Sequence, residues 1–101
     1  MSLKSLSWPD APKIVVTPPG PKTLEYLETQ NKYFPQHVQA RQPSGRWPTI
    51  VWESARGATV RDIDGNIYID FSGGQHTAST GHSHPKVVKA ISEAVASSWC
   101  P

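Results

Sequence analysis

The chain is 101 residues long, carries a net charge of +2 and contains a single cysteine, Cys100. One cysteine excludes an internal disulfide and fits a reducing compartment. Lysine and arginine are scattered and form no run, so we expect neither nucleic acid nor a membrane as a partner. No apolar run reaches membrane-spanning length, and the first residues lack the apolar centre of a secretory signal. We therefore expect a cytoplasmic protein with one small domain.

Residues 1–20 predict an extended N-terminal arm. They are rich in proline, which restricts φ and removes backbone donors. The apolar patch of this arm is Ile14–Val16. If the arm stood alone, we would expect it to be disordered, because so few of its side chains can be buried.

A helix is predicted from Pro21 to Phe34. Proline suits the first helical position because its missing N–H would have no partner there, and Pro35 ends the pattern. The stretch that follows, residues 36–48, is polar and contains several turn-forming residues, which predicts a loop.

Three short runs of β-forming residues predict a small antiparallel sheet. They cover residues 49–52, 60–63 and 67–71. Arg56-Gly57 and Asp64-Gly65 mark the two turns, because glycine readily takes the positive φ values that tight hairpin turns require. We expect the hairpin around Asp64-Gly65 to be the most regular element of the chain.

The sequence changes character at residue 72. Residues 72–84 are almost all small or polar, and we expect a loop without regular structure. From Pro85 onward the apolar residues recur at helical spacing, with Ser83 or His84 expected to cap the new helix. Its apolar stripe consists of Val87, Val88, Ile91, Ala94 and Val95. The fold class is thus an α+β unit of arm, helix, small antiparallel sheet and helix.

The central segment carries a longer pattern. From Gly57 it reads G-A-x-x-x-D-x-D-G-N-x-Y-x-D-F, then S-G, then S-T-G-H-x-H-P-K-V-V-x-A-I up to Ile91. This pattern resembles the N-terminal part of class III pyridoxal-phosphate (PLP) aminotransferases. A weaker likeness lies upstream, where P-K-I-V-V-x-P-P-G-P-K at Pro12 to Lys22 is similar to the opening of archaeal members.

The resemblance implies an α/β PLP-dependent transferase of fold type I. Residues 21–101 would be the N-terminal part of its small domain, so we expect a fragment that stops before the large PLP-binding domain. It also implies that the full-length protein is a homodimer with PLP as its cofactor. The arm, residues 1–20, would lie across the partner subunit.

The resemblance places candidate substrate-binding residues in the loop, at Gly74, Gln75 and His76. In the family the position of Gln75 lines the substrate side of the PLP pocket, and glutamine there looks like the branch that decarboxylates dialkylglycines. An amide can hydrogen-bond a substrate carboxylate and help to choose which bond at Cα is cleaved. A glycine beside it makes room for substrate. For Gln75 and for His76 the alternative is a solvated loop side chain, which is the commoner state of glutamine.

No catalytic, cofactor-binding or metal-binding residue is expected within this chain. The family's PLP lysine and its aspartate partner belong to motifs beyond residue 101, whereas Lys86 and Lys89 fit the solvated face of a helix. His82 and His84 are two residues apart, but a metal site needs a third or fourth ligand. Helix capping explains this pair of histidines better than a metal site does.

Two kinds of function remain open. The first is amino-group transfer between an amino donor and a 2-oxo acid by the full-length PLP enzyme, with an amino-acid racemase or a dialkylglycine-type decarboxylase as the alternatives in the same chemistry. We expect the present chain to be inactive by itself. The second is a short non-catalytic protein that binds a partner through the apolar stripe of its last helix.

Overall fold

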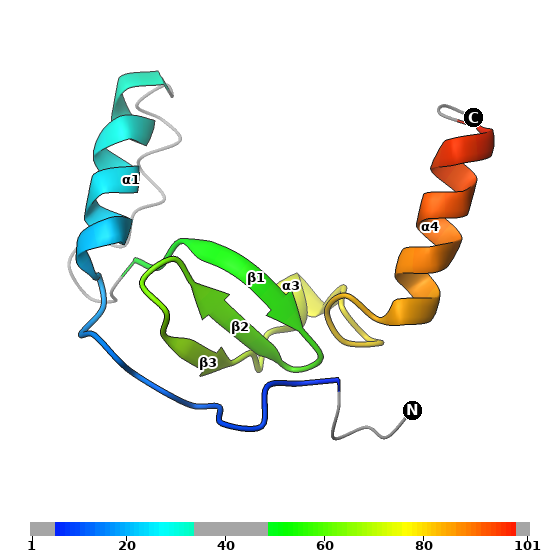
Figure 1. Ribbon diagram of the computed structural model, residues 1–101, viewed down its shortest axis with the longest axis horizontal. Helices are drawn as coiled ribbons and strands as arrows, with labels where there is room; N and C mark the ends of the chain where they lie inside the picture. The colour runs from blue at the N-terminus through cyan, green and yellow to red at the C-terminus, as the bar shows by residue number, and fades with distance from the viewer. Residues whose placement is uncertain (1–5, 34–48, 99–101) are drawn as a thin grey trace.

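The computed structural model describes residues 6–33 and 49–98, and its elements follow the predicted order (Figure 1). The predicted end of the first helix at Phe34 and the predicted loop 36–48 lie outside the described residues. The elements are α1 Pro21–Tyr33, β1 Trp52–Arg56, β2 Thr59–Asp62, β3 Ile67–Ile69, α3 Gly73–His76 and α4 Pro85–Ser97.

The three strands form one antiparallel sheet in the order β1-β2-β3, which confirms the predicted sheet. The first strand was predicted at residues 49–52, and this was wrong, because β1 occupies Trp52–Arg56. Its position is set by the short turn at Gly57, which pairs Ala55 with Val60 across the hairpin. This edge strand is largely exposed, so its residues do not show the apolar alternation that identifies a half-buried strand.

A buried polar centre holds the second hairpin turn. The Asp62 carboxylate accepts hydrogen bonds from the Asp64 N–H at 3.0 Å, from the Asn66 N–H at 2.8 Å and side chain at 2.9 Å, and from the Tyr68 hydroxyl at 2.7 Å. Partial burial, followed by this hydrogen bond to Asp62, raises the pKa of Tyr68 to about 12. Gly65 supplies the positive φ of 91° that was predicted for the turn.

The N-terminal arm pairs with the β3 edge of its own sheet, so the expectation of a disordered arm was wrong for the part described (Figure 1). Lys13 and Ile67 exchange two backbone hydrogen bonds of 2.8 and 2.7 Å. The side-chain oxygen of Asn66, a residue with no exposed surface, accepts the N–H groups of Val15 and Val16 at 2.7 and 2.9 Å. The arm therefore covers backbone groups that a free sheet edge would leave unpaired.

Asp64 connects the same turn to the start of α1. Its carboxylate accepts the Lys22 N–H at 2.8 Å, the Thr23 N–H at 3.0 Å and the Thr23 hydroxyl at 2.6 Å. These are donors that the first turn of a helix cannot pair internally, so Asp64 caps α1 from more than forty residues away. Partial burial acts to raise the pKa of Asp64, but the Thr23 and Lys22 hydrogen bonds outweigh it and leave the pKa below its ordinary value.

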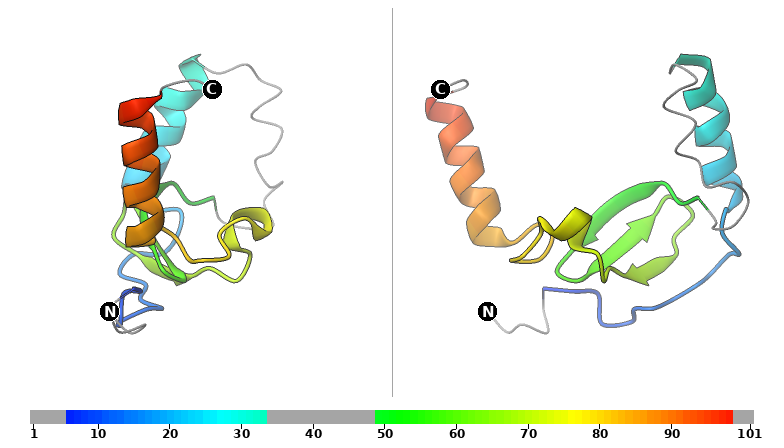
Figure 2. Two further views of the ribbon diagram at one scale, coloured as in Figure 1. Left: turned by 90° about the vertical axis from the view of Figure 1, so that its right-hand side faces the viewer. Right: turned by 180° about the vertical axis from the view of Figure 1, so that it is seen from behind.

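The two long helices stand away from the sheet. α1 and α4 rise from its opposite ends on the same side, and the view from behind shows the same arrangement (Figures 1 and 2). In the described part of the chain the buried apolar residues are Val60 and Ile67, whereas the α4 stripe is exposed, with Ile91 at 58% and Val95 at 52%. Within residues 6–33 and 49–98, neither helix has the length and apolar character needed to cross a membrane.

Candidate functional site

The loop after β3 contains one turn of left-handed helix, so the prediction that residues 72–84 lack regular structure was wrong for Gly73–His76. All four residues of α3 have positive φ, at 58°, 60°, 60° and 66° in chain order. The turn closes with hydrogen bonds from the His76 N–H to the Ser72 carbonyl at 2.9 Å and from the Thr77 N–H to the Gly73 carbonyl at 3.0 Å. The two consecutive glycines are the sequence signal for it, because glycine enters this conformation without steric cost.

The two following residues enter the same conformation at a cost. Gln75 and His76 carry Cβ atoms, and a left-handed φ brings Cβ close to the next carbonyl oxygen. Each such residue costs about 1–2 kcal/mol, and it persists only where surrounding contacts hold the backbone. The contacts that hold this turn start from Asp70.

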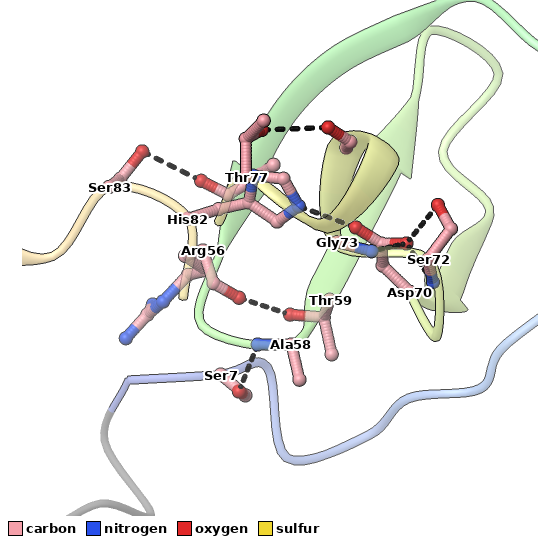
Figure 3. Close-up of polar contacts among 12 residues, drawn as sticks. Ser7, Arg56, Ala58, Thr59, Asp70, Ser72, Gly73, Thr77, His82 and Ser83 are labelled. Carbon is pink, nitrogen blue, oxygen red and sulfur yellow. Dashed lines mark hydrogen bonds and ion pairs between the residues drawn. The ribbon is translucent and has the colours of Figure 1, made fainter. Parts of the chain in front are cut away.

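Asp70 lies immediately after β3 and uses both carboxylate oxygens (Figure 3). Its Oδ1 accepts the Ser72 N–H at 3.0 Å, the Ser72 hydroxyl at 3.1 Å and the Gly73 N–H at 3.0 Å. Its Oδ2 lies 2.6 Å from Nε2 of His82. One carboxylate thus binds the beginning of the loop and a residue twelve positions later.

Asp70 is the acceptor in its contact with His82. The hydrogen bond from His82, ahead of the opposing effect of burial, holds the pKa of Asp70 below its ordinary value of 3.8. Asp70 is therefore ionised at neutral pH and can only accept, so the short contact requires a hydrogen on Nε2 of His82. Only 7% of the Asp70 side chain and 16% of the His82 side chain are exposed, which strengthens the bond.

His82 is in turn held against the sheet. Its N–H and C=O exchange hydrogen bonds of 2.8 and 2.9 Å with the backbone of Gly57. The Trp52 ring meets the imidazole edge-on, with ring centroids 5.5 Å apart. A Cβ on Gly81 would come within 3.1 Å of Gly57, so glycine at position 81 permits this close approach of loop and turn.

A hollow of about 300 Å³ opens beside this pair. Of the predicted substrate-binding residues, His76 lines the hollow, whereas Gln75 and Gly74 do not, and both Gln75 and His76 are exposed. The Gly74 carbonyl instead accepts the Thr77 hydroxyl at 2.7 Å. The lining is formed by Asp70, Phe71, Ser72, Gly73, His76, Ala78 and Ser79.

Sequence reasoning missed the role of Asp70 and His82 in this site. His82 was considered as a metal ligand or part of a helix entrance, and Asp70 as a residue within the predicted strand 67–71. The available signal was an acidic residue closing a strand and a histidine after a glycine, with a glycine-rich loop between them. That pattern does not state that the two side chains meet.

The neighbouring histidine has the predicted structural role. His84 is the N-cap of α4, and its Nδ1 accepts the Lys86 N–H at 3.3 Å. Among the described residues, no group of three or more histidine, cysteine, aspartate or glutamate side chains is placed to hold a metal ion.

The comparisons with known proteins support the family resemblance that the sequence pattern from Gly57 to Ile91 indicated. The model of the aminotransferase class-III family matches residues 40–100. An alanine/serine racemase of Pyrococcus horikoshii is 42% identical over 84 residues, 83% of this chain and 17% of the racemase. An isoleucine 2-epimerase of Lentilactobacillus buchneri is 38% identical over 72 residues, 71% of this chain and 15% of the epimerase.

A transaminase is similar to the same segment. A 5-aminovalerate aminotransferase of Pseudomonas aeruginosa is 47% identical over 69 residues, 66% of this chain and 16% of the aminotransferase. The chain thus spans about one sixth of the length of the curated relatives it matches. Because the family model covers more than half of the chain, and includes the sheet, the Asp70–His82 pair and α4, the chain belongs to the class-III aminotransferase family.

Proposed function

We propose that the protein containing this chain is a PLP-dependent enzyme that transfers an amino group between an amino donor and a 2-oxo acid. The observation that carries the proposal is the family match over residues 40–100, supported by an aminotransferase among the relatives. As parts of the same proposal, the enzyme is a cytoplasmic homodimer of fold type I, and residues 21–101 belong to its small domain.

The described residues do not themselves fit PLP. The cofactor needs a lysine amine to bond it, and no lysine lines the hollow beside Asp70 in the part of the chain that the structure describes. Lys89 lies on α4, where it is 75% exposed and 3.7 Å from Glu93. The cofactor-binding residues of the proposed enzyme therefore belong to other parts of the protein, and we derive no chemical step from this segment.

We propose that the segment forms one side of the substrate-binding site. Its loop places the Gln75 amide and the His76 imidazole on an exposed turn, with His76 bordering the hollow. We propose that Gln75 binds the substrate carboxylate, that His76 is a second donor, and that Gly74 makes room for the substrate. A neutral amide can donate to a carboxylate without changing its charge state.

A racemase is the second candidate, and a specific observation favours it. Two relatives, the alanine/serine racemase and the isoleucine 2-epimerase, match 83% and 71% of the chain, a longer stretch than the 66% matched by the aminotransferase. Racemisation and transamination both begin with loss of the Cα hydrogen and differ in where the proton returns. A dialkylglycine-type decarboxylase, indicated by glutamine at position 75, is the third possibility in this chemistry.

The test uses the protein at its full natural length, purified with PLP. It is incubated with single L-amino acids, with and without 2-oxoglutarate, and products are separated by chiral chromatography. Formation of glutamate together with the new 2-oxo acid supports the proposal. Appearance of the D-amino acid without any 2-oxo acid assigns the racemase instead, and the absence of any PLP-dependent product contradicts both.

A further inference from the structure

We propose that Asp70 and His82 are positioning residues, which clamp the two ends of the loop between them and so set where the left-handed turn presents Gln75 and His76. This inference rests on the proposed function, because it assumes that the turn faces a substrate. Asp70 and His82 act through the loop, because Asp70 accepts from Ser72 and Gly73 and His82 contacts Asp70.

The clamp is anchored on the sheet. The His82 backbone is joined to Gly57 in both directions, and its ring rests against Trp52 of β1. Asp70 follows directly on β3, and its N–H donates to the Ala58 carbonyl at 2.9 Å. Both members are thus joined by backbone hydrogen bonds to the turn between β1 and β2, and their side chains meet at 2.6 Å.

The free end of the clamp reaches the turn. The Asp70 Oδ1 atom accepts three donors from Ser72 and Gly73, the residues that enter the left-handed turn (Figure 3). Because Oδ1 and Oδ2 belong to one rigid group, rotation of the carboxylate to release His82 also misaligns the donors of the turn. The orientation of the turn is thereby coupled to the contact between Asp70 and His82.

The backbone of the turn gives a reason for such a device. Gln75 and His76 adopt left-handed φ values of 60° and 66°, which residues with a Cβ rarely take. A segment in this conformation relaxes when its contacts are lost. Without the clamp, we expect the turn to remain a loop but to present the two side chains in many directions.

Two pairs of variants separate positioning from other roles. His82→Leu removes the donor and keeps the bulk, whereas His82→Gln keeps an N–H near the place of Nε2. Asp70→Asn keeps an oxygen for Ser72 and Gly73 and offers its amide N–H to Nε2, so the contact can re-form with the hydrogen reversed. Asp70→Ala removes both carboxylate oxygens, and with them the bonds to Ser72 and Gly73 and the contact with His82. His84→Gln is the matched control, because His84 caps α4 and makes no contact with Asp70.

The experiment measures kcat and KM of the full-length enzyme with PLP, together with the folded fraction at the assay temperature and hydrogen exchange at Gly73. For His82→Leu and Asp70→Ala we expect kcat/KM to fall at least tenfold, with faster exchange at Gly73. For His82→Gln and Asp70→Asn we expect recovery to within about threefold of the wild type. The control should stay at the wild-type value.

The outcomes distinguish this inference from the proposed function. An active wild type whose kcat/KM is unchanged in His82→Leu and Asp70→Ala overturns the clamp alone. Loss of activity in Asp70→Asn with an intact fold also overturns it, because the charge would then matter and not the position. If His82→Leu and Asp70→Ala do not fold, the kcat/KM values of His82→Gln and Asp70→Asn still test the clamp. Values within about threefold of the wild type support it, and a larger loss overturns it. A wild type without any amino-acid activity overturns the proposed function and this inference with it.

Discussion

The sheet with its arm is held in a different way from α4. In the sheet, buried polar side chains such as Asp62 and Asn66 bind turns and arm together, and few apolar residues are buried. In α4 the apolar stripe is exposed, and no hydrogen bond joins its side chains to the sheet beyond the capping region in the described part of the chain. The sheet is thus specified by polar contacts of precise geometry, and Asp64 joins the first turn of α1 to it. α4, in contrast, relies on local backbone bonds and on its cap.

Substitutions in the sheet should therefore change the free energy of unfolding more than substitutions in α4. A buried acceptor serving several donors cannot be removed without leaving those donors unpaired, which costs more than the bonds contribute. An exposed apolar side chain has little burial to lose.

The largest effect is expected at the centre of the polar network. Asp62→Ala leaves the Asn66 N–H, the Asn66 side chain and the Tyr68 hydroxyl without their acceptor, and we expect a loss of about 4 kcal/mol in the free energy of unfolding. Urea unfolding followed by tryptophan fluorescence measures it. Asp10→Ala is the control, because its ion pair with Lys13 is about half exposed and should contribute less than about 0.5 kcal/mol. Equal losses in the two variants would contradict the polar-network account.

A smaller loss is expected in the apolar core. Val60 is 2% exposed, and Val60→Ala removes two buried methyl groups, which should cost about 2 kcal/mol in the same unfolding experiment. Val60→Thr is a useful companion, since it preserves shape but introduces a hydroxyl. If Val60→Ala leaves the free energy of unfolding unchanged, burial of this side chain does not stabilise the sheet. The sheet would then not differ from the exposed α4 stripe in its apolar contacts.

A local effect of pH is expected at α1. Because the folded pKa of Asp64 is lowered, the hydrogen bonds it accepts contribute stability that is present above its ordinary pKa of 3.8 and lost as pH falls through the lower, folded value. The Lys22 and Thr23 amides should therefore show faster hydrogen exchange in that acidic range, while the remaining amides of the sheet change less. Asp64→Asn should weaken the cap at neutral pH and remove the acid transition; an unchanged transition would assign it to another group.

The sequence predicted the elements whose signals are local. Asp64-Gly65 indicated its turn, and proline followed by apolar spacing indicated α4, because each depends on a few neighbouring residues. β1 was displaced since an exposed edge strand shows no alternation. Three contacts join residues that are far apart in the chain: Asn66 with Val15, Asp64 with Thr23 of α1, and Asp70 with His82. The residues next to each of them in the sequence do not indicate which distant residue it will contact.

In the candidate site, too, the sequence predicted the local features and missed the contacts between distant residues. The sequence placed Gln75 and His76 in a loop beside the sheet, and the resemblance assigned them to the substrate. It did not predict the left-handed turn, although Gly73-Gly74 made one possible, because the two residues with a Cβ enter it against their own preference. In our proposal that conformation is held by the hydrogen bonds that Asp70 accepts from Ser72 and Gly73. Asp70 itself directly follows the last residue of β3.

The smallest effect is expected on the exposed stripe of α4. Ile91 is 58% exposed, so in this 101-residue chain Ile91→Ser should change the free energy of unfolding by less than about 0.5 kcal/mol, through helix propensity and slight loss of contact. Lys89→Ser on the polar side is the matched control for propensity. The two variants should differ little in helix content, measured by circular dichroism, and in unfolding midpoint. A loss of about 2 kcal/mol in Ile91→Ser alone would mean that the stripe is buried against another surface, because only removal from water gives an isoleucine that much to lose. The contrast between a sheet held by buried contacts and an α4 held by local ones would then fail.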